Sequence, residues 1–209
     1  LADDITLSTA GAGNFSITGL QGDLSNTASG TVAVTLADNT GGDYTVNSTQ
    51  TISVNNGTAQ DTDTITLAGS GAKTVNALVA DLSLDSTNTG TTNVTTADAS
   101  LTITANAAAG ALTVDANSTA TTQTISLTGG DNGTSATVNN LVANLTASGL
   151  ASALTVGLND ASDDAISITT GSYTSSISGS AAGDTITVDA TALADDITLS
   201  TAGAGNFSI

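Results

Sequence analysis

The sequence contains no cysteine, histidine, proline, methionine, tryptophan, glutamate or arginine, and its only basic residue is Lys73. Without cysteine or histidine, the chain has neither a disulfide framework nor a zinc site. One cation cannot neutralise the phosphates of a nucleic acid, and it gives little attraction to an anionic membrane surface. No apolar run approaches the roughly 20 residues that span a bilayer. We therefore expect no nucleic-acid partner and no membrane insertion.

The residues that are present make an acidic chain rich in small polar side chains. Its 209 residues include 19 aspartates, 41 threonines, 24 serines and 22 glycines, and the formal net charge is −18. Hydrophobic residues make up 39% of the chain, which is enough to build a core. The composition favours a secreted bacterial or archaeal protein, extracellular or on the cell surface. Because the sequence starts at Leu1 without a signal-like segment, we expect a piece of something longer.

Internal repeats indicate the architecture. Residues 193–209 are identical to residues 1–17, so the period is 192 residues. We expect residues 1–192 to form one module and residues 193–209 to begin the next identical module. Shorter periods of about 60 and 30 residues lie inside the module, and they divide it into six turns that begin near residues 5, 34, 65, 94, 125 and 154. The last of these is enlarged by about 12 residues around 171–182.

Each 30-residue repeat contains three short triplets of the form apolar–hydroxyl–apolar, such as Ile5-Thr6-Leu7. Alternation with a period of two puts the aliphatic side chains on one face and the hydroxyls on the other. The triplets predict an all-β fold, a parallel β-solenoid (β-helix) with about 30 residues and three short strands per turn and six turns per 192-residue module. Six turns at the usual strand spacing would advance a module by about 29 Å.

Two other folds compete with this prediction. Tandem immunoglobulin-like sandwiches need about 100 residues each, and the shorter periods do not divide the module that way. Residues 137–154 have spacing that would also suit a short helix. Their counterpart at residues 74–82 has β-like flanks, which favours strands.

Catalysis finds little support in the sequence. Serine and threonine have no histidine to activate them, and the aspartates recur with the turns instead of converging. We therefore expect no enzyme. Threonine arrays of this kind also resemble those of ice-binding proteins, but the second threonine column is broken, and hydroxyl ladders that stabilise neighbouring strands are the better account. Lys73 is expected to be a loop residue.

Several aspartates stand just before predicted strands, where carboxylates in tight turns are the hard oxygen ligands that calcium prefers. Calcium is the one cofactor that we expect, and the alternative is that these carboxylates cap turns and supply charge repulsion. The calcium candidates are Asp163, Asp164, Asp184, Asp195 and Asp196.

Asn-x-Ser/Thr triplets are candidate sites of N-glycosylation. They begin at Asn14, Asn47, Asn56, Asn93, Asn117, Asn132, Asn144 and Asn206. Composition alone would give about five such triplets, so each is only a candidate. A coat of glycans would suit a polar fibre that is exposed to its surroundings.

The strings DDITL at residues 3–7 and GDTITV at residues 183–188 resemble the Thr- and Asp-rich β-strand repeats of RTX-type bacterial surface-layer proteins and giant repetitive adhesins. The resemblance implies secretion, a cell-surface location and calcium-dependent folding or assembly. The sequence does not preserve the GGxGxDxUx register of the RTX calcium repeat.

We accordingly expect a structural repeat module of a long extracellular fibre, filament or surface coat, whose partner is itself, as neighbouring identical modules. The alternative is the stalk of a giant cell-surface adhesin, stabilised by calcium. A functional amyloid is a third interpretation, but the long and unequal turns argue for winding within one chain.

Overall fold

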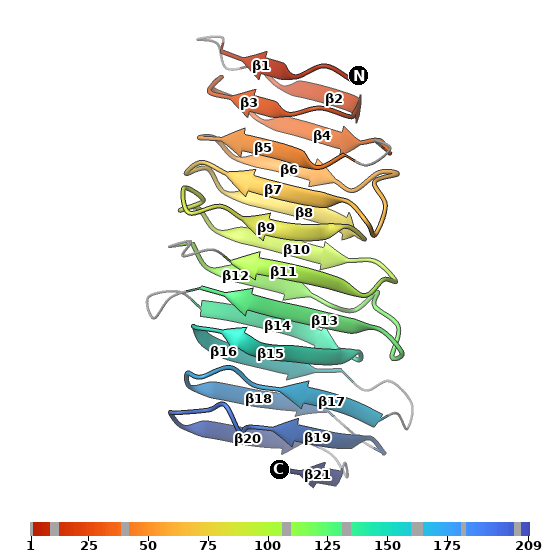
Figure 1. Ribbon diagram of the computed structural model, residues 1–209, viewed down its shortest axis with the longest axis vertical. Helices are drawn as coiled ribbons and strands as arrows, with labels where there is room; N and C mark the ends of the chain where they lie inside the picture. The colour runs from red at the N-terminus through yellow and green to blue at the C-terminus, as the bar shows by residue number, and fades with distance from the viewer. Residues whose placement is uncertain are drawn as a thin grey trace.

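The strands of this protein stack into one elongated body whose termini lie at opposite ends (Figure 1). The structure, a computed structural model, describes residues 2–8, 13–38, 42–105, 110–130, 135–159, 165–180, 183–202 and 206–209. Within these ranges there are 21 strands and no α-helix, and thus no helix that is suited to crossing a membrane.

The strands form two parallel sheets, and consecutive strands alternate between them. The 11-stranded sheet, called sheet A, contains β1 (Ile5–Leu7), β3 (Leu24–Asn26), β5 (Tyr44–Ser48), β7 (Thr64–Ala68), β9 (Asp81–Leu84), β11 (Leu101–Ala105), β13 (Thr124–Gly129), β15 (Asn144–Leu150), β17 (Ala165–Thr169), β19 (Thr185–Asp189) and β21 (Asn206–Ser208). The 10-stranded sheet, called sheet B, contains β2 (Phe15–Leu20), β4 (Val32–Leu36), β6 (Ile52–Asn55), β8 (Lys73–Leu78), β10 (Thr92–Thr96), β12 (Leu112–Asp115), β14 (Ser135–Leu141), β16 (Ala153–Leu158), β18 (Ser175–Ser180) and β20 (Ile197–Ala202).

The predicted parallel β-solenoid is confirmed, but the predicted turn is wrong. Each strand pairs with the strand two places further along the chain, so one turn contains two strands. Ile65 pairs with Leu82, 17 positions later, and Leu101 pairs with Ile125, 24 positions later. Paired residues in a parallel ladder are one turn apart, so one turn contains about 20 residues instead of about 30.

The physical reason is that the sequence repeat and the turn are different lengths. Each of the first five 30-residue repeats does contain three strands, as predicted, and β1, β4, β7, β10, β13 and β16 begin the six repeats. Three strands shared between two sheets make one and a half turns. Successive repeats therefore begin in opposite sheets, and six turns per module is wrong as well. The 19 strands β1 to β19 advance the stack by about 46 Å, not 29 Å.

The alternative of a helix over residues 137–154 is also settled. Strands β14, β15 and the start of β16 cover this stretch, with hydrogen-bonded partners in both sheets. The similar segments at 74–82 and 137–145 both pass from sheet B to sheet A, and each carries a residue with a left-handed backbone, Ala77 at φ 52° and Asn140 at φ 56°. The shared sequence thus encodes a shared bulged corner, where the register shifts.

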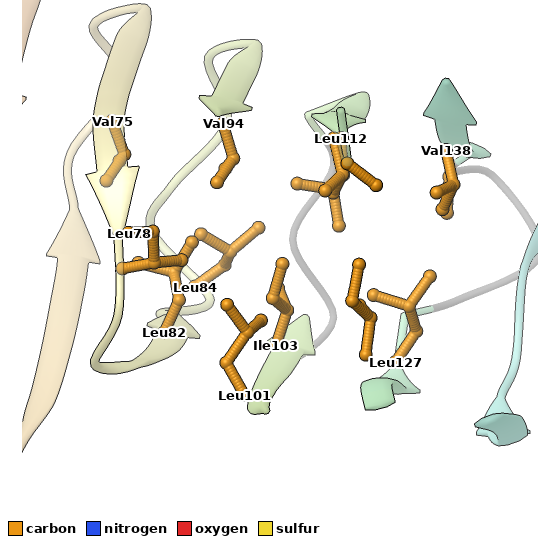
Figure 2. Close-up of a cluster of buried hydrophobic side chains, with 14 of the residues drawn as sticks. Val75, Leu78, Leu82, Leu84, Val94, Leu101, Ile103, Leu112, Leu127 and Val138 are labelled. Carbon is orange, nitrogen blue, oxygen red and sulfur yellow. The ribbon is translucent and has the colours of Figure 1, made fainter. Parts of the chain in front are cut away.

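The core is a row of aliphatic side chains from each sheet that meet between the sheets (Figure 2). Alternation along the strands buries every second residue, as the triplets predict. In sheet B one inward position pairs with the same position on every successive turn, and it holds Ile17, Val34, Val54, Val75, Val94, Val114, Val138, Val156, Ile177 and Leu199. Identical β-branched neighbours fit one another at the strand spacing and pack against the leucines of sheet A.

One corner of the stack leaves no room for a side chain in three successive turns. It lies between the end of each sheet A strand and the start of the next sheet B strand. A Cβ on Gly71 would overlap the carbonyl group of Gln50, one on Gly90 would overlap that of Gly71, and one on Gly110 would overlap that of Gly90. Glycine is required at these positions because the backbones of successive turns are in contact.

We predict that Gly90→Ala lowers the free energy of unfolding by about 1–3 kcal/mol, because the new methyl group collides with backbone that cannot rotate away. Gly157→Ala is the matched control, since the nearest atom to a Cβ at Gly157 is 3.7 Å away. The control should change stability by less than about 0.5 kcal/mol. Urea unfolding followed by circular dichroism measures both. Equal stabilities of the two variants would contradict the stacked corner.

Candidate functional site

The structure describes three of the five aspartates that were predicted to bind calcium. Asp163 and Asp164 lie outside the described residues. Asp184 is buried before β19, and its backbone carbonyl accepts a hydrogen bond from the amide of Asn206. Asp195 and Asp196 are exposed in the turn before β20. The described part of the chain contains no group of three acidic side chains placed to hold a metal ion, so calcium binding stays a prediction.

A different role is visible for the aspartates at the start of the sheet A strands. In four places a carboxylate accepts a hydrogen bond from a backbone amide one turn further along the stack. The pairs, carboxylate first, are Asp4 with Asp23 at 3.0 Å, Asp23 with Thr45 at 2.7 Å, Asp43 with Thr64 at 3.2 Å and Asp81 with Thr102 at 2.7 Å. We call these four carboxylates the aspartate ladder. They tie four pairs of successive turns together outside the regular pairing of the strands.

Other residues extend this arrangement. At the same place in later turns, Ser100 accepts a hydrogen bond from the amide of Thr124, and Asn144 accepts one from the amide of Ser167. All three residue types offer a short side-chain oxygen close to the backbone. The shared feature is therefore the acceptor oxygen, and a negative charge is not required for it.

A second group of aspartates closes turns locally. Asp85 accepts from the amide of Thr87 at 2.8 Å, and this bond is the largest cause that lowers the pKa of Asp85 below its ordinary value. Asp189 accepts from both the hydroxyl and the amide of Thr191, which likewise lowers its pKa. These are side-chain turns of the kind that aspartate favours. The alternative interpretation, in which carboxylates cap turns, is thus supported for these residues.

The glycosylation candidates fall into several environments. Asn14, Asn47, Asn93, Asn117 and Asn206 are exposed, Asn144 is half-buried, and Asn132 lies outside the described residues. Asn56 differs from all of them because it is buried. Its side-chain oxygen accepts from the amides of Val79 and Ala80, and its side-chain amide donates to the carbonyl of Ala59. A glycan on Asn56 would displace these hydrogen bonds, whereas the exposed sites stay available.

Lys73, the only basic residue, was predicted to lie in a loop, and this is wrong. It is the first residue of β8, and its side chain is fully buried. It occupies the inward position that Ile52 fills one turn earlier. The ammonium group donates to the carbonyls of Gly69 and Gly71, both at 2.6 Å, and lies 3.5 Å from the carbonyl of Ser48. The triplet Lys73-Thr74-Val75 was the available signal, since lysine there replaces the first apolar residue.

The surroundings of Lys73 form a buried polar corner. Asn26 donates to the hydroxyl of Ser48, and Asn88 donates to the hydroxyl of Thr92, which pairs with Lys73 in register. The side-chain oxygen of Asn88 has no hydrogen-bond partner among the described residues. Burial among neutral groups disfavours the charged form and lowers the pKa of Lys73 from 10.5 to about 8.

The two ends of the stack offer the remaining candidate site. Ile5, Leu7 and Phe15 at one end are only partly buried, although they point toward the core. The same residues of the repeated segment, Ile197, Leu199 and Phe207, are partly buried at the other end. Within the described chain, β1 pairs only with β3 and β21 only with β19. Each end therefore presents a strand edge and the end of the apolar core.

Comparisons with protein-family models, with curated proteins and with solved structures find no match to this chain. The described residues enclose no pocket. The features that the described residues offer are those of the stack itself: the aspartate ladder, the polar corner and the two open ends.

We predict that Asp81→Ala lowers the free energy of unfolding by about 1–2 kcal/mol, because the amide of Thr102 loses a charged acceptor. Asp81→Asn keeps an acceptor oxygen and should recover most of the loss. Asp61→Ala removes the same charge from an exposed turn residue and is the control. If the three variants have the same free energy of unfolding, the aspartate ladder contributes no stability.

Lys73 makes stability depend on alkaline pH. The pKa of Lys73 is about 8 in the folded chain and 10.5 without burial, so the unfolded state binds more protons between these values. Stability should therefore rise as the pH increases from about 8 to 10.5. Lys73→Met removes this contribution, and the difference between the two pH profiles isolates it from the tyrosines. Parallel profiles would show that Lys73 titrates alike in both states.

Proposed function

We propose that this chain is a structural repeat module of a long extracellular fibre, filament or surface coat, and that modules continue one β-stack end to end. The observation that carries the proposal is the position of the repeated segment. Residues 197–199 and 206–208 repeat residues 5–7 and 14–16, and they already belong to both sheets as β20 and β21. The start of a second module thus has a place on the end of the first.

The register of this junction supports continuity. Ser175 of β18 pairs with Ile197, and Ile186 of β19 pairs with Phe207. The junction between residues 192 and 193 falls inside the turn at 190–196, which is no longer than the turn at 56–63 between β6 and β7. A turn of ordinary length leaves no room for a linker, so hydrogen bonding and apolar packing pass through the junction.

The mechanism is mechanical. Backbone hydrogen bonds run along the axis of a parallel stack, and the aspartate ladder adds further bonds in the same direction. Each added module covers the strand edge of the one before, which leaves open edges only at the ends of the fibre. A structural role of this kind requires no catalytic group.

Charge and composition support an extracellular location. A net charge of −18 discourages sideways aggregation unless divalent cations bridge neighbouring fibres. Calcium is the cation that we propose, through exposed carboxylates such as Asp195 and Asp196. We propose that glycans are carried by the sequon asparagines that are exposed.

A second candidate function is the stalk of a giant adhesin, stabilised by calcium, which holds a distal binding domain away from the cell. The same continuous stack would serve it. The two functions differ in self-association, because a fibre or coat requires contacts between separate chains and a stalk does not.

Electron microscopy of a protein with several tandem modules tests the proposal. We expect straight thin rods with an axial module repeat of about 46 Å. Calcium should bundle the rods, and a chelator should release them, because bridging cations offset the repulsion between carboxylates. Globules joined by flexible segments would contradict the fibre, and rods that stay single at all calcium concentrations would favour the stalk.

A further inference from the structure

We propose that successive modules of the array are related by half a turn about the axis of the stack, so that sheet A of one module continues as sheet B of the next. The inference rests on the proposed end-to-end continuation. Beyond that continuation, it specifies which outer surface of each module faces each side of the fibre.

The two copies of the repeated segment carry the argument. Residues 5–7 form β1 in sheet A, and the identical residues 197–199 begin β20 in sheet B. Residues 14–16 include the start of β2 in sheet B, and the identical residues 206–208 form β21 in sheet A. Both segments have therefore exchanged sheets after one period of 192 residues.

The exchange preserves the inside and the outside of the stack. Thr6 and Thr198 are both exposed, whereas their neighbours Ile5, Leu7, Ile197 and Leu199 all pack against the core. The repeated segment thus buries the same side chains in either sheet. This is possible because both sheets alternate inward and outward residues with the same period of two.

The cause is the odd number of strands in a module. Five of the six 30-residue repeats supply three strands each, and the sixth supplies four: β16, β17, β18 and β19. The additional strand is β18, which lies in the stretch around 171–182 that enlarges the sixth repeat. Without β18 a module would have an even number of strands, and the next module would begin in the same sheet as the first. With β18 the next module begins in the opposite sheet, as β20 does.

The half turn matters because the two outer faces differ. Both faces carry paired hydroxyls, such as Thr66 beside Ser83 in sheet A and Ser53 beside Thr74 in sheet B. The four carboxylates of the aspartate ladder, however, all lie at the start of sheet A strands. Alternation places both kinds of surface on each side of the fibre, with a full repeat after two modules, or about 91 Å. A second fibre can then make equivalent contacts on either side, which suits a coat built by lateral association.

Labelling of one face tests the proposal. The chain contains no cysteine, so Thr155→Cys introduces one thiol per module at an exposed position of β16. In a three-module protein, gold clusters on these thiols should alternate between the two sides of the rod, with an axial spacing of about 46 Å. Gold along one side of an intact rod would overturn the half turn and leave the fibre standing. Beads on flexible linkers would overturn both proposals.

Two controls separate the half turn from gradual twisting of the stack. Gold at Asn93→Cys and Thr155→Cys of one module marks two positions on sheet B, in β10 and β16, and measures the twist within a module. Gold at Thr155→Cys in the first and third modules only should lie on one side after correction for that twist. Opposite sides in this control would contradict the proposal.

A deletion tests the role of β18. Removing residues 171–182 from every module takes away one strand and leaves an even number. Gold at Thr155→Cys should then lie along one side, at a spacing of about 43 Å. Alternating gold in rods of the deletion variant would show that β18 does not determine the sheet in which the next module begins. If the variant does not form rods, the labelling of the unmodified repeat still decides the half turn.

Discussion

The spacing of about 4.8 Å between hydrogen-bonded strands governs this structure. At that spacing each residue lies directly above its counterpart in the previous turn. The residues at one position in successive turns form a column, and the column is stable only if its members tolerate close contact with one another. Valine does so in the core of sheet B, and glycine does so at the tight corner, where backbones touch. The sequence is thus repetitive because residues are selected by column. A residue that fits poorly in one turn affects the turns on both sides of it.

The sequence predicted the strands, their direction and their inward faces because alternation of apolar and hydroxyl residues is a local property. It did not predict the length of a turn. Alternation is the same in both sheets, so nothing in the triplets shows that Val34 belongs to sheet B and Ile5 to sheet A. The 60-residue period was the better guide. It spans six strands, an even number, which returns a residue such as Ile65 to the sheet of Ile5.

The charged residues show why composition was a weaker guide than pattern. Several carboxylates that were not among the calcium candidates, Asp23 and Asp81 among them, accept backbone amides from the next turn. Lysine suggested a solvated loop, whereas Lys73 lies inside and satisfies three donors with backbone carbonyls. Both roles depend on which turns become neighbours. That information is absent from any single stretch of sequence, and it appears only when the turn length is known.

Strand number acquires a meaning in a two-sheet stack that it lacks in other folds. Adding two strands lengthens the body by one turn and leaves every later residue on its original side. Adding one strand moves all later residues to the opposite side, at the cost of a single corner. Since the core accepts the same aliphatic triplet in either sheet, such an insertion leaves the packing intact and changes only the outer surface. The strand β18 is therefore a small change in sequence that can redistribute the surface of an entire fibre, while its Ile177 continues the core of sheet B.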